Sequence, residues 1–342
     1  MFVYFVLALV VILAVAFTYT IGFQDGSGVA ASAIKARAIT GRQAVVLVSI
    51  FEFTGAMLGG SAVARAIRDI TSWPARPDLL PVLASSLSAA IIWNIFTRRM
   101  GVPTSSTHAL VGGILGGVIA GGGMQYISWG SPDLIYKATG VWKVLLSLFL
   151  SPFAGFLVGL LLFKFFAFIL QSVSTKANKY LNGMEWVLVP MLAFGHGANE
   201  TQKAMGVIML ALCAAGLSQG EEIPLWVRTI SALAVASGIL SVAPLIVRRV
   251  GGIYKQRPLH GFISQLSSAS IVLFASFTGG PLSTSQVVAS SIVGVGSAER
   301  IKGVHWQVAR EIVRAWFLTI PAVALFAWLL YMLLFRHLNL FL

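Results

Sequence analysis

Charged residues are scarce in this chain, and acidic residues are the scarcest. Only 10% of the 342 residues are charged and only 11 are Asp or Glu, whereas 57% are hydrophobic. Soluble domains carry about 25% charged residues, so this composition excludes an ordinary soluble fold. Several stretches without Asp, Glu, Lys or Arg exceed the roughly 18–20 residues that span a bilayer, which predicts an integral membrane protein built from helices. The stretches without these four residue types are 1–24, 79–97, 100–132, 144–163, 204–220, 229–247 and 258–298, and the first, third and last of them exceed 20 residues.

Other absences narrow the functional classes. A single cysteine, Cys213, leaves no intrachain disulfide and indicates no redox compartment. The net charge of +13 is not gathered into a basic block with interleaved aromatics, so we do not expect nucleic acid as a partner. No nucleotide-binding motif occurs, which argues against direct ATP drive. The motifs HExxH, GxGD and GxSG are also missing, and the sequence predicts that the protein is not an enzyme.

The apolar part of the chain divides into ten segments in two sets of five. A polar linker, residues 171–185, joins a first unit (1–170) to a second unit (186–342). Polar, Gly-rich stretches at 22–28 and 195–203 interrupt the first and sixth segments, so we expect broken helices there. The predicted fold class is an all-α polytopic membrane protein of ten to twelve helices. We place the segments at about residues 2–34, 44–64, 79–96, 101–123, 142–170, 186–215, 227–247, 259–277, 279–296 and 315–335.

Two pairs of motifs recur at nearly the same spacing. Residues 22–25 (GFQD) align with 197–200 (GANE) at an offset of 175, and 101–108 (GVPTSSTH) align with 279–286 (GGPLSTSQ) at an offset of 178. This agreement predicts duplication of a five-segment unit. Because an odd number of crossings inverts the second copy, we expect an inverted repeat with hairpin-like re-entrant elements.

The charges of the loops fit the inverted plan. The loop after the first segment is basic, whereas its counterpart carries Glu221 and Glu222. If the basic loops face the cytoplasm, the positive-inside rule is satisfied and both termini face outward. The loops placed inside are residues 35–42, 164–179, 248–257 and 300–314.

Two hydroxyl clusters open the two re-entrant elements. Helix N-termini offer free N–H groups and the positive end of the dipole, and Ser and Thr hydroxyls add rotatable donors, which together suit an oxyanion such as phosphate. We expect the charge of Lys203 and the amide of Gln202 to complete this site. The candidate phosphate ligands are Thr104, Ser105, Ser106, Thr107, Ser283, Thr284, Ser285, Lys203 and Gln202.

Two carboxylates lie in the polar stretches and suit a cation instead. Asp25 and Glu200 would bind a coupling ion, H⁺ or Na⁺, and we expect Asn199 and Gln24 to share that site. The candidate metal site is Na⁺ at Asp25 or Glu200, and the sequence indicates no other metal site. We expect no cofactor.

Each feature also has a simpler interpretation. Ser and Thr in membrane helices often hydrogen-bond to their own backbone, and Gly-rich runs serve close helix packing. Glu52 is more often a paired or interfacial residue than a ligand, and His108 and His196 are more often core histidines. The recurrence of the polar stretches in register is what favours a site.

The four motifs together resemble those of the inorganic phosphate transporter (PiT) family. Residues 194–206 (FGHGANETQKAMG) are similar to its second-half signature HGxNDxQKxMG, and residues 101–112 (GVPTSSTHALVG) to its GxPxSTTHALxG element. Residues 280–288 (GPLSTSQVV) resemble the second copy of that element, and residues 22–25 (GFQD) resemble GFHD. The resemblance covers nearly the whole chain, with the motifs in order.

The resemblance implies an inverted-repeat helical transporter, often a homodimer, that moves phosphate with Na⁺, with H⁺ or as a metal–phosphate complex. Four positions depart from the family pattern: Glu200 replaces an Asp, Gln24 a His, Gly28 an Asn and Gln286 a His. The longer acid and the missing amide alter any cage for a small cation. The expected coupling therefore shifts from Na⁺ towards H⁺.

We predict a secondary active transporter (symporter or permease) of inorganic phosphate in the plasma membrane, which is the inner membrane in a bacterium. The alternatives are a permease of sulfate or another oxyanion, since the resembling family includes sulfate permeases, and a passive anion channel, whose selectivity elements look alike. The expected partners are phosphate, the lipid bilayer and a second copy of the chain. Because the sequence has no large cytoplasmic domain, regulation would require a separate cytoplasmic protein.

Overall fold

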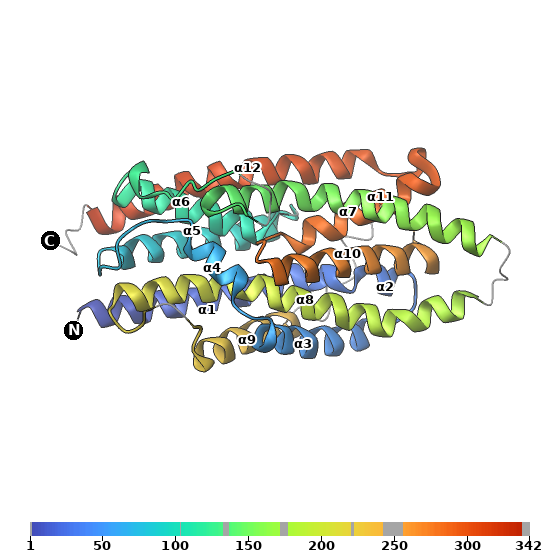
Figure 1. The fold of residues 1–342 in the computed structure, drawn as a ribbon, viewed down its shortest axis with the longest axis horizontal. Helices are drawn as coiled ribbons and strands as arrows, with labels where there is room; N and C mark the ends of the chain where they lie inside the picture. Colours follow the sequence, from blue (N-terminus) through green and yellow to red (C-terminus); the bar gives the residue numbers. More distant parts are fainter. Residues whose placement is uncertain are drawn as a thin grey trace.

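A computed structural model describes residues 2–102, 104–132, 137–171, 177–219, 222–241 and 256–336. Within these ranges the chain forms an elongated bundle of α-helices and no β-strand (Figure 1). Among the described residues, six helical regions are long and apolar enough to cross a membrane. The predicted all-α membrane fold is thereby confirmed.

The helices follow the predicted order of segments. In the first half they are α1 (Phe2–Val29), α2 (Ala31–Lys35), α3 (Gly41–Leu58), α4 (Ala62–Arg68), α5 (Leu79–Met100), α6 (Ser106–Gly121) and α7 (Gly140–Leu170). In the second half they are α8 (Ala177–Ala214), α9 (Leu225–Leu240), α10 (Pro258–Thr278), α11 (Thr284–Arg300) and α12 (Trp306–Tyr331). Short 3₁₀ turns lie at Met124–Tyr126 and Ile301–Gly303, and a π turn follows α12 at Met332–Arg336.

The two predicted re-entrant elements begin in the same way. Gly101 (φ +75°) caps the end of α5 and Gly279 (φ +74°) caps the end of α10, both in the left-handed region that glycine adopts without a steric penalty. The residue immediately before the next helix, Ser105 before α6 and Ser283 before α11, has an extended backbone. The chain therefore changes direction at two equivalent positions of the two motif copies.

The prediction that the polar stretches break their helices is wrong. α1 runs uninterrupted through residues 22–28 and ends at Val29, and α8 runs uninterrupted through residues 195–203. Both stretches therefore present their polar side chains from a continuous helix.

Close packing explains why these stretches contain glycine. A Cβ added to Gly22 would lie 2.2 Å from the carbonyl oxygen of Val235, and a Cβ added to Gly197 would lie 2.1 Å from that of Glu52. The glycines therefore let α1 approach α9 and let α8 approach α3, as small residues do between membrane helices. At these two positions the glycines serve close helix packing, which was the simpler interpretation of the Gly-rich runs.

The connections differ from the predicted loops in one respect. α8 begins at Ala177, so it takes up much of the predicted linker 171–185. Of the residues used in the orientation argument, Glu221 and the stretches 172–176 and 248–255 lie outside the described residues.

The ends of the helices sort into two groups. The end of α1 with α2, the end of α7, the start of α8 and the turn between α11 and α12 lie at one end of the bundle, on the right in Figure 1. The start of α1 and the end of α12 lie at the opposite end. The described parts of the predicted cytoplasmic loops thus gather on one side of the molecule.

Candidate functional site

Four segments bring polar side chains together inside the bundle. They are the end of α1, the first turn of α6, the middle of α8, and residues 279–284 leading into α11. Ser105 caps α6, since its hydroxyl accepts a hydrogen bond from the backbone N–H of His108 (3.2 Å). The side chains of this cluster are buried, so each needs a partner.

Glu200 on α8 joins the starts of α6 and α11. Its Oε1 accepts hydrogen bonds from the backbone N–H and the hydroxyl of Thr284, each at 3.3 Å. Its Oε2 lies 3.4 Å from the hydroxyls of Ser106 and Thr107. One carboxylate therefore reaches both re-entrant elements, and it occupies the free N–H end of α11 as an anion would.

Lys203 lies one helical turn after Glu200 and is fully buried. Its Nζ is 2.6 Å from Oε2 of Glu200. It also donates to the hydroxyl of Thr107 (2.5 Å) and to the backbone carbonyl of Leu282 (2.6 Å). An ammonium has three N–H donors, so these three acceptors use all of them.

Asp25 and Gln24 bring α1 to the same region. The hydroxyl of Ser106 donates to Oδ2 of Asp25 at 2.8 Å. The amide of Gln24 donates to the carbonyl and the hydroxyl of Thr104, at 3.2 and 3.1 Å. Asp25 thus lies beside the hydroxyls of α6, and the hydroxyl of Ser106 bridges it to Glu200.

Asn199 fixes the turn before α11. Its Nδ2 donates to the carbonyl of Gly280 (3.1 Å), and its Oδ1 accepts from the backbone N–H of Leu282 (3.3 Å). Ser283 and Ser285 contact each other through their hydroxyls at 3.1 Å. The amide therefore anchors the segment that also supplies the Leu282 carbonyl to Lys203.

Gln202 does not join the other predicted ligands. Its Oε1 accepts from the backbone N–H groups of Val63 (2.9 Å) and Ala64 (3.3 Å), and its Nε2 donates to the carbonyl of Gly59 (2.7 Å). These contacts satisfy backbone groups where α3 ends and α4 begins. Gln202 therefore holds the α3–α4 connection against α8.

Two contacts near the site involve the histidines of the motifs. His196 Nδ1 lies 2.8 Å from Oε1 of Glu52, and both side chains are fully buried. His108 lies within 3.3 Å of the amide nitrogen of Gln286 on α11. Glu52 is therefore paired, as its simpler interpretation held, and both histidines have side-chain partners.

Sequence reasoning missed two groups that complete the cluster. The backbone carbonyl of Leu282 binds both Lys203 and the hydroxyl of Thr107 (2.9 Å). The hydroxyl of Thr97, at the end of α5, lies 2.8 Å from that of Thr104. No side-chain signal marks a carbonyl ligand, although an extended residue beside a proline-containing turn is a place to look for one.

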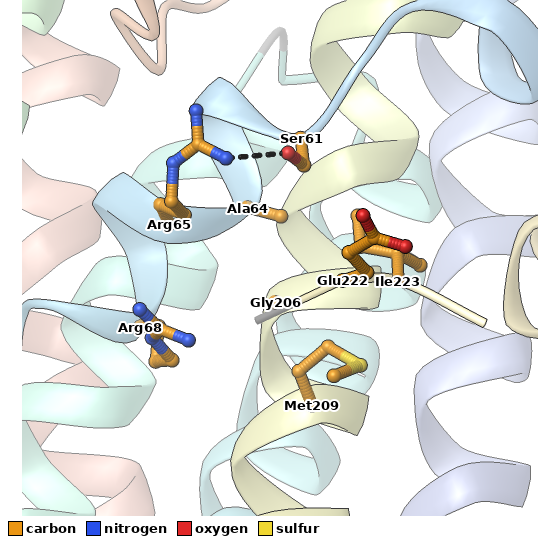
Figure 2. Close-up of a pocket in the computed structure, with 8 residues that line it drawn as sticks. All are labelled: Ser61, Ala64, Arg65, Arg68, Gly206, Met209, Glu222 and Ile223. Carbon is orange, nitrogen blue, oxygen red and sulfur yellow. Dashed lines mark hydrogen bonds between the residues drawn. The ribbon is translucent and has the colours of Figure 1, made fainter. Parts of the chain in front are cut away.

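Two hollows lie away from the cluster's charged centre. Figure 2 shows a pocket of about 10 Å³ between α4 and α8, where Arg65 donates to Ser61 at 2.6 Å. Its volume is about that of one water molecule, so it does not suit a solute. A larger apolar cavity of about 460 Å³ lies between α7, α11 and α12, with Phe153 and Trp316 in its wall, and reaches His108 and Gln286.

Comparisons with known proteins agree with this arrangement. A profile of the "Phosphate transporter family" matches residues 21–327. A "probable low-affinity inorganic phosphate transporter" of Bacillus subtilis (strain 168) is 34% identical over 329 residues, covering 95% of this chain and 96% of the relative. One of Rhizobium meliloti (strain 1021) is 32% identical over 320 residues, covering 92% of each.

A solved structure entitled "The sodium-dependent phosphate transporter" has the same fold. It matches with a TM-score of 0.82 over 98% of this chain and 100% of that chain, at 23% identity. At this identity the likeness is one of fold. The relatives named above are transporters, not enzymes.

Proposed function

Since this chain belongs to the phosphate transporter family, we propose that it moves inorganic phosphate across a membrane by secondary transport, driven by a gradient of H⁺ or Na⁺. The observation that carries the proposal is the meeting of two helix starts at one carboxylate. Oε1 of Glu200 accepts from Thr284 at the start of α11, and its Oε2 lies 3.4 Å from Thr107 at the start of α6.

The physical basis is the supply of donors to an oxyanion. Each helix start provides backbone N–H groups that have no partner within the helix itself, together with a partial positive charge. The buried hydroxyls of Ser106, Thr107 and Thr284 donate to Asp25, Leu282 and Glu200 in this structure, and to bind phosphate they would turn from these acceptors towards the anion. In a low-dielectric interior such donors bind an anion more strongly than they do in water.

The neighbouring carboxylates favour phosphate over sulfate. Asp25 accepts a hydrogen bond from Ser106 and so lies at the edge of the hydroxyl cluster. At neutral pH phosphate retains at least one O–H, which can donate to a carboxylate, whereas sulfate has none and is repelled. This difference supports phosphate as the substrate and assigns Asp25 a role in selecting it.

The carboxylates also support a coupled carrier rather than a passive channel. Asp25 and Glu200 add negative charge beside the anion position, so a cation that enters with phosphate lowers the free energy of the loaded site. We further propose that the end of the bundle where the basic loops gather faces the cytoplasm. Both termini then face the outside.

Uptake of ³³P-labelled phosphate into proteoliposomes tests this function. We expect accumulation above the external concentration when a pH or Na⁺ gradient is imposed, little competition by excess sulfate, and none in protein-free vesicles. Equilibration without accumulation would identify a passive channel. Full inhibition by equimolar sulfate would identify a general oxyanion permease, and no uptake under either gradient would refute the proposal.

A further inference from the structure

The ammonium of Lys203 is enclosed by oxygen atoms from three separate segments. Oε2 of Glu200 comes from α8, Oγ1 of Thr107 from the first turn of α6, and the Leu282 carbonyl from the extended stretch before α11. All three lie 2.5–2.6 Å from Nζ. The lysine side chain is fully buried, so no solvent competes for these acceptors.

This set of ligands is the kind that a hard metal cation binds. Such cations prefer carboxylate, hydroxyl and backbone carbonyl oxygens. Carbonyls of unwound backbone are typical ligands for coupling ions in transporters. The lysine nitrogen therefore lies where a monovalent metal ion would lie if the side chain were shorter.

We propose that Lys203 is a built-in cation that fills this oxygen cage, so that the chain needs no Na⁺ at this position and shortening the side chain opens the cage to Na⁺. The inference rests on the proposed transport function and concerns which cation neutralises Glu200 during the cycle. The protein supplies one positive charge itself, so Na⁺ is not required at this position.

The geometry disfavours the alternative in which Lys203 binds phosphate directly. All three N–H donors of the ammonium are directed at protein oxygens. A phosphate oxygen could replace one of them only by displacing a carboxylate, a hydroxyl or a backbone carbonyl that is itself buried, and each of those would then lack its partner. Lys203 would therefore attract phosphate through its charge, without contact.

Two substitutions separate these possibilities. Lys203→Asn shortens the side chain and places an amide oxygen at the edge of the cage, leaving room for an ion. Lys203→Met keeps the length of the side chain and fills the same space with apolar atoms. Gly183→Ala, at an exposed position of the same helix with open space around it, is the matched control.

The first measurement is the melting temperature of the purified full-length protein in NaCl and in choline chloride at equal ionic strength. An ion that binds only the folded state stabilises it by RT ln(1 + [ion]/Kd) and so raises Tm. Relative to choline, we expect Na⁺ to raise the Tm of Lys203→Asn by more than the Tm of wild type, Lys203→Met or Gly183→Ala. Adding Glu200→Gln to Lys203→Asn removes the carboxylate and should abolish the Na⁺ effect.

The second measurement is phosphate uptake into proteoliposomes. Lys203→Asn should lose uptake in choline and regain it in NaCl, whereas Lys203→Met should stay inactive in both. Absence of a Na⁺-dependent Tm shift in Lys203→Asn would overturn the inference even if wild type transports phosphate. If Lys203→Asn cannot be purified in choline chloride, its recovery in NaCl would support the cage. If it cannot be purified in either salt, Lys203→Gln takes its place, and no rise in the Tm of Lys203→Gln in NaCl would overturn the inference.

Discussion

Lys203 and Glu200 lie one turn apart on α8, with 2.6 Å between Nζ and Oε2, and both side chains are buried. This ion pair joins α8 to the starts of α6 and α11, since Glu200 also accepts from Thr284 and Lys203 also donates to Thr107. Breaking a buried pair leaves an uncompensated charge. The pair is therefore both a structural link and the electrostatic centre of the site.

Removing the ammonium should destabilise the protein because Glu200 is then left without its cation. We expect Lys203→Met to lower the free energy of unfolding by about 3–5 kcal/mol, seen as a lower Tm in choline chloride. The double variant Lys203→Met/Glu200→Gln should recover part of this loss. A double variant no more stable than Lys203→Met would mean that the two charges are not energetically coupled.

Removing the charge of Glu200 alone should uncouple transport. In Glu200→Gln the neutral amide can neither balance Lys203 nor take part in a change of charge during the cycle. We expect loss of gradient-driven phosphate uptake while phosphate–phosphate exchange persists in vesicles loaded with unlabelled phosphate. Intact pH-driven uptake in this variant would exclude Glu200 from the coupling mechanism.

The hydroxyls at the two helix starts should contribute to phosphate affinity. A hydrogen bond to a charged partner contributes about 1.5–3 kcal/mol, so Ser106→Ala and Thr284→Ala should each raise KM for phosphate by about 10–140-fold. Ser290→Ala is the control on α11, because that hydroxyl donates to the carbonyl of Val287 (3.0 Å). An unchanged KM in both test variants would place the phosphate elsewhere.

The close approach of α8 to α3 should make Gly197 intolerant of any side chain. A Cβ there would lie 2.1 Å from the carbonyl oxygen of Glu52, whereas a Cβ at Gly183 meets nothing within 4 Å. We expect Gly197→Ala to give little folded protein by size-exclusion chromatography. Gly183→Ala should be stabilised by about 0.5–1 kcal/mol, as expected for an exposed helical glycine. Equal yields of both variants would contradict the packing explanation.

The sequence predicted those site residues that act through their side chains. The motifs placed Asp25, Glu200 and the two hydroxyl clusters in register, and the structure brings Asp25, Ser106, Glu200 and Thr284 into one hydrogen-bonded cluster. The spacing of residues in the sequence does not show, however, in which direction each side chain points. Gln202 follows the site residues closely in sequence, yet it points to the end of α3.

The course of the backbone was harder to predict. Glycines beside polar residues in an apolar segment favour a broken helix and a close helix contact equally well from sequence alone. The outcome depends on whether another helix lies against those glycines, as α9 does at Gly22. The Leu282 carbonyl was likewise invisible, because every residue carries such an oxygen and only the fold decides which one is left free.

The glycine contacts have an evolutionary consequence. Gly197 is flanked by His196 and followed by Asn199, Glu200 and Lys203, so one short signature encodes both the distance between two helices and the chemistry between them. A substitution at the glycine would displace every neighbouring side chain together, whereas a substitution at the acid alters one group. Divergence within the signature should therefore occur at the chemical positions first, and a change of ion or substrate can evolve there without rebuilding the bundle.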